Sequence, residues 1–197
     1  MTDINTAKGS GEGPSKDPID RMAPDVGLPS AVALERLTPV VELIFFAYRD
    51  FTSESDAVLE AYGFGRAHHR VLHFVTWRSG LRVADLLETL RITKQSLARV
   101  LKKLVDRGFI VQEAGAADRR ERRLYPTLEG RKLAEQLRAL QTRRIAAALG
   151  EIEPAGQAAA LGFLLALTAQ PDRAGLAQML ADCGMTPSRP MTETRVR

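Results

Sequence analysis

A strongly amphipathic helix constrains the fold of this chain more than any other feature. Over residues 93–108, TKQSLARVLKKLVDRG, Leu97, Leu101 and Leu104 recur at helical spacing, and polar or charged side chains fill the opposite face. Thr93 is suited to the N-cap, because its hydroxyl can accept a hydrogen bond from a free amide of the first turn. The segment is therefore predicted to be a helix that buries one face and exposes the other.

The flanking segments predict a specific arrangement around this central helix. A short helix over 83–90 precedes it, and Arg91–Ile92 is only long enough for a tight turn. Two β-leaning runs, 109–114 and 122–127, follow it and flank a polar segment with a glycine, which is typical of a hairpin. This order is the layout of a winged helix-turn-helix, so the expected fold class is mainly α with a small two-stranded β wing.

Apolar residues at helical spacing predict further helices on both sides of this central part. The segment 52–65 is polar with two glycines and is predicted to be a linker with room for a helical turn. Residues 1–30 and 184–197 lack periodicity and are predicted to be disordered tails. The predicted outer helices are 34–51, 66–77, 128–149, 155–168 and a weaker one over 173–182.

Basic residues gather in the segment that holds the central helix and the hairpin. Residues 91–132 contain twelve lysines and arginines against five acidic residues, whereas residues 1–60 contain five against eleven. A positive block inside a folded region suggests a polyanionic partner. A solvated basic helix face is the alternative that charge alone leaves open.

The polar face of the central helix carries residue types suited to DNA. Gln95, Arg99 and Lys102 follow i, i+4, i+7 spacing and share one face. Glutamine pairs with adenine and arginine with guanine at base edges, whereas lysines suit phosphates. The candidate contacts are Gln95, Ser96 and Arg99 for bases, Lys94, Lys102 and Lys103 for phosphates, and Thr93 at the cap.

The hairpin tip concentrates positive charge on a narrow projection. The run DRRERR, residues 118–123, places four arginines in six residues. An arginine on such a tip can enter a narrow minor groove, where the negative potential is strongest. Arg120 is the main candidate, with Arg119 or Arg122 beside it, and Asp118 can hold a neighbouring guanidinium as support. A floppy charged loop is the alternative.

The run from Leu86 to Gly130 resembles the MarR family of transcriptional regulators. The resemblance lies in LLETLRITKQSLARVLKKLVDRGFI and in DRRERRLYPTLEG. The wing pattern of the family is D-x-R followed by Thr-x-x-Gly at the start of the next helix. Asp118, Arg120, Thr127 and Gly130 stand at these places.

Two positions depart from the family pattern. Arg91 stands where the family often has glycine, and Pro126 replaces the usual aliphatic residue before the threonine. Neither change is expected to break the fold. Within the family, GFGRAHHRVLHF together with ITKQSLARVL resembles the PetP-like branch.

The resemblance implies a sequence-specific regulator that binds double-stranded DNA as a homodimer. Its operator would be a pseudo-palindrome, and a cleft between the dimer region and the DNA-binding lobe would bind a small-molecule effector. The implied organisation is a tail over 1–30, a winged-helix domain over 31–170, and a weak helix with a flexible tail over 171–197. Within the domain, a DNA-binding lobe of about 66–127 lies between dimerisation helices of about 34–51 and 128–168.

Three histidines leave other functions open. His69 and His73 are spaced i, i+4, which can chelate a metal from one helix face, and His68 lies next to them. A metal-sensing regulator is therefore one alternative, and a small hydrolase using these histidines is another. A winged-helix module that binds proteins is a third. The sequence contains no recognisable motif around a catalytic nucleophile and no phosphate-binding glycine loop. We therefore expect no enzymatic activity and no cofactor.

Compartment and redox chemistry follow from a few negative features. No apolar run approaches the ~20 residues that a membrane span needs, and residues 1–30 lack a secretory signal pattern. Cys183 is the single cysteine and is expected to be an inert thiol. We therefore expect a cytoplasmic protein with no membrane partner.

Overall fold

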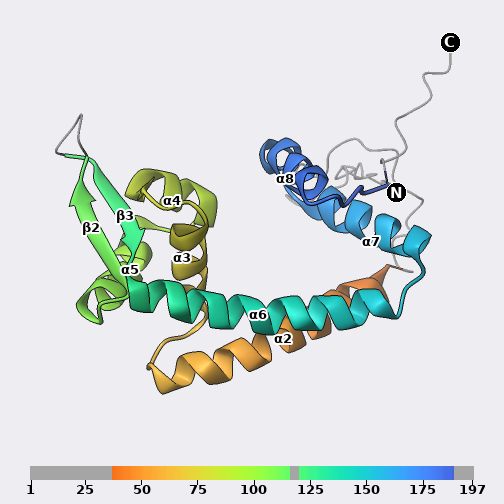
Figure 1. Cartoon of the computed structure of the whole chain (residues 1–197), viewed down its shortest axis with the longest axis horizontal. Helices are drawn as coiled ribbons and strands as arrows, with labels where there is room; N and C mark the ends of the chain where they lie inside the picture. Colours follow the sequence, from red (N-terminus) through yellow and green to blue (C-terminus); the bar gives the residue numbers. More distant parts are fainter. Residues whose placement is uncertain (1–36, 116–119, 189–197) are drawn as a thin grey trace, which may run out of the picture. The chain divides into compact units, whose positions relative to one another are not determined.

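The computed structural model describes residues 37–115 and 120–188 and is mainly helical with a small antiparallel sheet (Figure 1). The expected fold class is confirmed. The described residues divide into two units at the boundary between Ala47 and Tyr48. In order, the elements are α2 (Thr38–Ala61), α3 (Arg66–Trp77), β1 (Leu81–Arg82), α4 (Val83–Leu90), α5 (Lys94–Asp106), β2 (Ile110–Ala114), β3 (Arg122–Pro126), α6 (Leu128–Gly150), α7 (Pro154–Leu167) and α8 (Gln170–Asp182).

The sheet has three strands in the order β1-β3-β2, where two were expected. The additional strand, β1, pairs Leu81 with Leu124 and Arg82 with Arg123. Gly80 leads into it with a φ of 86°, and its amide donates to the Leu124 carbonyl at 2.9 Å. A strand of two residues is too short to show an alternating pattern, which is why the sequence did not reveal it.

Helix α2 extends to Ala61, so the prediction that 52–65 is a linker was wrong over most of its length. Two of the polar residues there, Thr52 and Ser53, fit a helix because their hydroxyls bond to its own carbonyls. Thr52 Oγ1 donates to the carbonyls of Tyr48 and Arg49, both at 3.1 Å. Leu59 is fully buried on the same segment and ties it to the core.

The core lies among α3, α4, α5, the sheet and the first half of α6. The predicted stripe of α5 is confirmed, because Leu97, Leu101 and Leu104 are all buried. Burial of each such side chain contributes about 1.5–3 kcal/mol. The other members of the core cluster are Leu59, Phe64, Val71, Leu72, Val75, Leu81, Leu86, Leu90, Phe109, Ile110, Leu124, Leu133 and Leu137.

The turn between α4 and α5 positions α5. Arg91 adopts a left-handed conformation with a φ of 51°, and its amide donates to the Leu87 carbonyl at 2.9 Å. This conformation costs a non-glycine residue roughly 1–2 kcal/mol, which explains why glycine suits the position. Two residues later Thr93 caps α5, accepting from the Ser96 amide at 3.2 Å.

The C-terminal helices leave apolar side chains uncovered. Helix α7 has no buried residue, although it is the most apolar helix of the described part. Phe163, Leu164 and Leu167 are at least half exposed. Helix α8 begins at Gln170, three residues before the predicted start, because Pro171 is well tolerated in the first turn. Among the described residues, no helix is long and apolar enough to cross a membrane.

Several sequence predictions fall outside the described residues. They concern the two tails over 1–30 and 189–197, the wing-support residue Asp118 and the arginine at 119.

Candidate nucleic-acid interface

The outer face of α5 carries a row of three exposed polar side chains. Gln95, Arg99 and Lys102 are all exposed, opposite the buried leucines. Lys102 forms an ion pair with Asp106, one turn further along the helix. That pair is exposed at both ends and worth little, so the lysine can exchange the carboxylate for another anion.

The first turn of α5 presents a cap and a cation side by side. Besides accepting from the Ser96 amide, Thr93 Oγ1 donates to the Ser96 hydroxyl at 2.9 Å. Ser96 is half-buried, whereas Lys94 is exposed. Free amides at a helix N-terminus favour an anion, and the exposed lysine adds to this preference.

Lys103 lies on a different side of α5 from its neighbour Lys102. Its ammonium group donates to the carbonyl of Gly63 and lies 5.8 Å from the centre of the Phe64 ring. Both partners belong to the connection between α2 and α3. The structure therefore does not bring Lys103 together with Gln95 and Arg99, a distinction that two consecutive lysines in a sequence do not reveal.

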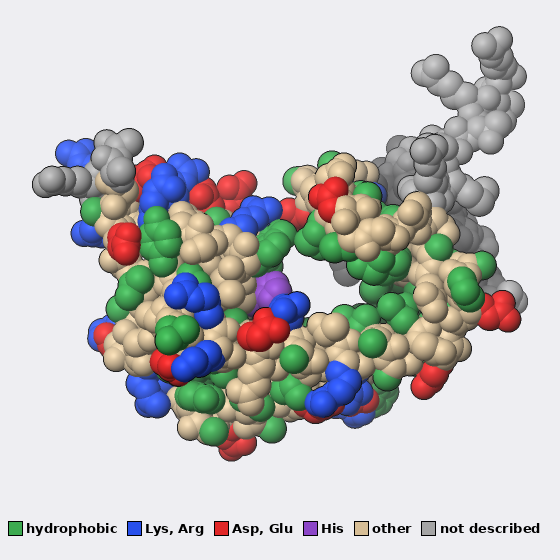
Figure 2. All heavy atoms as spheres, viewed as in Figure 1, with side chains coloured by type: hydrophobic (Ala, Val, Ile, Leu, Met, Phe, Trp, Pro, Cys, Tyr) green, Lys and Arg blue, Asp and Glu red, His purple; other side chains and the backbone are tan. Residues whose placement is uncertain are grey.

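A groove of about 700 Å³ separates α5 from the wing, the hairpin formed by β2 and β3. Lys94 and Lys102 line it from α5, and Arg120 and Arg122 line it from the wing. Figure 2 shows Lys and Arg side chains over the wing and the adjacent helices, with Asp and Glu side chains among them. The fold thus gathers cations that are up to 28 positions apart in the sequence along one groove.

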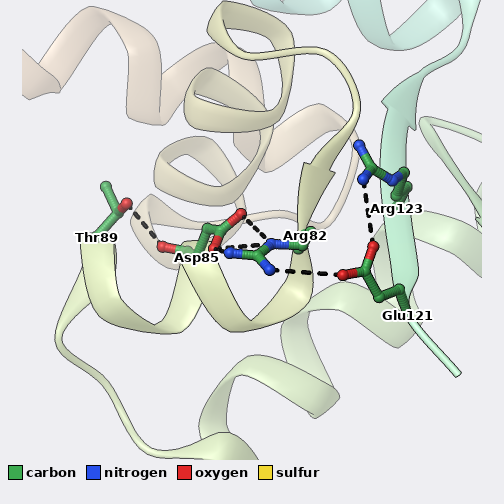
Figure 3. A network of polar contacts seen from close by, with 5 residues as sticks. All are labelled: Arg82, Asp85, Thr89, Glu121 and Arg123. Atoms are coloured by element: carbon green, nitrogen blue, oxygen red, sulfur yellow. Dashed lines mark hydrogen bonds and ion pairs between the residues drawn. The ribbon is translucent and has the colours of Figure 1, made fainter. Parts of the chain in front are cut away.

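A network of charged side chains joins the wing, at the point where its loop enters β3, to α4 (Figure 3). Arg82 donates from Nε to the Asp85 carboxylate at 2.8 Å, and its Nη1 lies 3.5 Å from Glu121 Oε1. The other oxygen of Glu121 accepts from Arg123 at 3.2 Å. The hydrogen bond from Arg82 holds the pKa of Asp85 below its usual value. The sequence did not point to Arg82, because the strand β1 that holds it was not predicted, nor to its pairing with Asp85 in the first turn of α4.

A second cavity, of about 390 Å³, lies among α2, α3 and α6. Arg70 lines it and donates to the Leu90 carbonyl, at the end of α4, at 3.3 Å. Burial lowers the pKa of both His69 and His73, which also line it. The remaining lining residues are Tyr48, Phe51, Thr52, Arg66, Phe74 and Gln141.

His68 is separate from this cavity. Its Nδ1 accepts from the Gly65 amide at 3.1 Å, and its ring stacks on Phe64 at 5.0 Å. Burial, with the nearby Lys103, lowers its pKa. In the part of the chain that the structure describes, no three His, Cys, Asp or Glu side chains gather closely enough to hold a metal ion.

Known proteins resemble this chain over most of its length. The family model described as the MarR family matches residues 62–121, from the end of α2 to the wing. The HTH-type transcriptional regulator PetP of Rhodobacter capsulatus is 41% identical over 155 residues, which cover 76% of this chain and 92% of PetP. The chain belongs to the MarR family.

A further relative and two solved structures are also similar to this chain. The transcriptional regulator HosA of Escherichia coli O157:H7 is 31% identical over 68 residues, which cover 34% of this chain and 50% of HosA. FabT of Streptococcus pneumoniae, solved in complex with DNA, has a TM-score of 0.58 at 15% identity and covers 74% of this chain and 97% of its own. A SlyA-like regulator from Listeria monocytogenes has a TM-score of 0.55 at 18% identity, with 75% and 96% covered. These two structures share the winged-helix fold, and the chain is a MarR-family transcriptional regulator.

Proposed function

We propose that this MarR-family regulator binds a specific double-stranded DNA sequence as a homodimer, under the control of a small molecule. The observation that carries the proposal is the groove in which α5 and the wing present Lys94, Lys102, Arg120 and Arg122 together. A groove lined with cations on both walls suits a phosphate backbone, and the exposed α5 beside it suits the major groove.

The residues of the interface have distinct roles in this proposal. Gln95 and Arg99 read base edges, because they project from the outer face of α5, and Ser96 assists at its first turn. Lys94 and Lys102 contact phosphates. Arg120 and Arg122, with the arginine at 119, enter the minor groove from the wing. Lys103 is left out, because its ammonium group is bound at Gly63.

A second copy of the chain would cover the exposed apolar side chains of the helices at the two ends. Phe45 of α2 is 67% exposed and Leu164 of α7 is 60% exposed, and similar residues surround each of them. Apolar surface of this kind favours association. Two-fold symmetry would place two α5 helices about 34–36 Å apart on one DNA face, so the operator is a pseudo-palindrome.

The cavity between α2, α3 and α6 is the proposed effector site. Its volume of about 390 Å³ suits a small molecule, and aromatic and cationic side chains line it together. Arg70 lies in this cavity and also bonds to the Leu90 carbonyl, just before the turn that leads into α5. The hydrogen bond from Arg70 thus connects the cavity to the turn before α5. A ligand that binds better to one position of Arg70 than to another would change the position of α5 and, with it, the affinity for DNA.

Selection of bound fragments from a pool of genomic DNA, followed by affinity measurements over a salt series, tests the proposal. We expect recovery of one pseudo-palindromic motif, and an affinity that falls steeply with salt. Weak binding to every duplex at physiological salt would instead favour a module that binds proteins. Metal in protein purified without chelator, lost in His69→Ala and His73→Ala, would favour a metal sensor.

A further inference from the structure

The wing has an acidic residue in the middle of its basic run. Glu121 stands between Arg120 and Arg122, and all three residues line the groove. A carboxylate near DNA phosphates repels them, so Coulomb energy alone disfavours glutamate at this position. The structure shows that the side chain is half-buried and contacts two arginines, Arg82 and Arg123.

Glu121 bridges two neighbouring strands through its carboxylate. One oxygen lies 3.5 Å from Nη1 of Arg82 on β1, and the other accepts from Nη2 of Arg123 on β3 at 3.2 Å (Figure 3). Arg82 and Arg123 are themselves cross-strand partners in the sheet. The backbone of Glu121 is also held, because its carbonyl accepts from the Gly115 amide at 3.1 Å.

The Arg82 end of this bridge is anchored on α4. Asp85 accepts from Arg82 Nε through both carboxylate oxygens, at 2.8 and 3.1 Å. Asp85 lies in the first turn of α4, where the helix dipole favours a negative charge. Helix α4 packs against both β1 and β3. The bridge therefore connects the wing to α4, the helix that packs before α5. Its far end is fixed on a helix and not on a loop.

We propose that Glu121 is a positioning residue that sets where the wing arginines reach on DNA, and so contributes to the choice of DNA sequence without contacting it. This inference rests on the proposed DNA-binding function. Arg120 and Arg122 flank Glu121 directly, so a fixed Glu121 restricts the space that both guanidinium groups can sample. A wing without these contacts keeps its positive charge and its attraction to phosphates. Its arginines, however, are no longer held at a fixed position relative to the DNA grooves.

Charge and position make opposite predictions for the substitution Glu121→Gln. If only charge matters, removing a carboxylate strengthens binding to every duplex by a similar factor. If Glu121 positions the wing, binding to a random duplex is strengthened or unchanged, whereas preference for the operator falls. Glu113→Gln is the matched control, because Glu113 is exposed on β2 of the same hairpin and the change in charge is identical.

The experiment compares the affinity for the selected operator with that for a scrambled duplex of equal length, at three salt concentrations. We expect Glu121→Gln to lower the ratio of the two affinities about three- to tenfold and Glu113→Gln to leave it unchanged. Arg82→Gln should lower the ratio as well, and the double variant Arg82→Gln/Glu121→Gln should lose no more than the larger single loss. Thermal melting checks that each variant is folded, and Asp85→Asn offers a second way to loosen the anchor.

The outcomes separate this inference from the function on which it rests. If the unaltered protein prefers its operator and Glu121→Gln retains the same ratio as Glu113→Gln, the positioning role is overturned and the regulator remains. Additive losses in the double variant would also overturn it, because residues of one network are not additive. If the unaltered protein prefers no duplex, the proposed function itself fails.

Discussion

A Cβ atom at Gly130 would lie 2.0 Å from the carbonyl oxygen of Phe109. The first turn of α6 therefore touches the backbone at the start of the wing. Thr127 fastens the same junction, since its hydroxyl donates to the Gly108 carbonyl at 2.7 Å and accepts from the Gly130 amide at 3.0 Å. This contact explains the Thr-x-x-Gly pattern in physical terms: the threonine caps α6, and the glycine leaves room for the wing.

Replacing Gly130 by alanine should destabilise the protein strongly. The added methyl group meets backbone and not a movable side chain, so α6 or the wing has to shift. We expect a loss of about 2–4 kcal/mol in the free energy of unfolding, measured by urea denaturation. The control is Gly150→Ala at the other end of α6, where a Cβ meets nothing within 4 Å. Alanine there should be neutral or slightly stabilising, and equal losses in both variants would contradict the argument.

Arg120→Ala should weaken binding to the operator without unfolding the protein. An arginine inserted in the minor groove contributes on the order of 1–3 kcal/mol, so Kd should rise by about 5- to 150-fold in a mobility-shift assay. Arg138→Ala on α6 removes the same charge from an exposed ion pair with Glu135 and should change Kd little. An operator affinity that stays unchanged in Arg120→Ala would contradict the assignment of the wing.

The two consecutive lysines of α5 should respond differently to the same substitution. Lys102→Gln should weaken binding to all duplexes alike and lower the slope of log Kd against log salt by about 1, because a phosphate contact is lost. Lys103→Gln should leave that slope unchanged. It should instead lower stability by about 1 kcal/mol, because the contacts with the Gly63 carbonyl and the Phe64 ring are lost. If Lys103→Gln lowered the salt slope and Lys102→Gln lowered stability, Lys103 and not Lys102 would be the phosphate contact.

These lysines also illustrate how far the sequence alone can lead. Periodicity correctly placed Leu97, Leu101 and Leu104 in the core, and the hydroxyl of Thr93 correctly predicted a cap, since these features are local. The side of α5 that faces the connection between α2 and α3 depends on tertiary packing, so the partner of Lys103 was not predictable. The same holds for β1, whose two residues form a strand only because β3 lies beside them.

The candidate site was also predictable only in part. The sequence identified the basic residues of α5 and of the wing, because both lie within one continuous segment. It did not identify the ion pair between Arg82 and Glu121, which joins residues 39 positions apart. Nor did it reveal that Arg70 reaches the Leu90 carbonyl, 20 positions away. Contacts between residues that lie far apart in the sequence can be identified only once the fold is known.

The histidines predict a loss of stability in mild acid. Burial is the main cause that lowers the pKa values of His68, His69 and His73 below 6.5, so the unfolded chain binds more protons than the folded one just below that pH. Stability should therefore fall as pH drops from 7 to 5, as thermal melts can show. Asp50 and Asp85, with pKa values below 3.8, add to the loss only under more acidic conditions.

The variant His69→Gln/His73→Gln separates these contributions. It should reduce the fall in melting temperature between pH 7 and 5, because glutamine does not titrate and His68 is the one histidine left, and it should keep the decline below pH 4. A decline of unchanged steepness between pH 7 and 5 would show that other groups cause it. The binding of a small molecule in the neighbouring cavity can be monitored in the same melts, because a ligand of the folded state raises the melting temperature.

Leu164→Arg should convert a dimer into a monomer. Leu164 is 60% exposed on α7 beside Phe163, where the proposed second copy would cover it. A charge in the centre of an apolar interface is costly, so sedimentation should show half the mass at micromolar concentration. Operator affinity should fall far more than affinity for a single half-site, because the two α5 helices would no longer be linked. Val111→Lys, at an exposed apolar position of the wing, is the control and should leave the mass unchanged. A Leu164→Arg protein that keeps the mass and the operator affinity of the parent would show that α7 is not part of the interface.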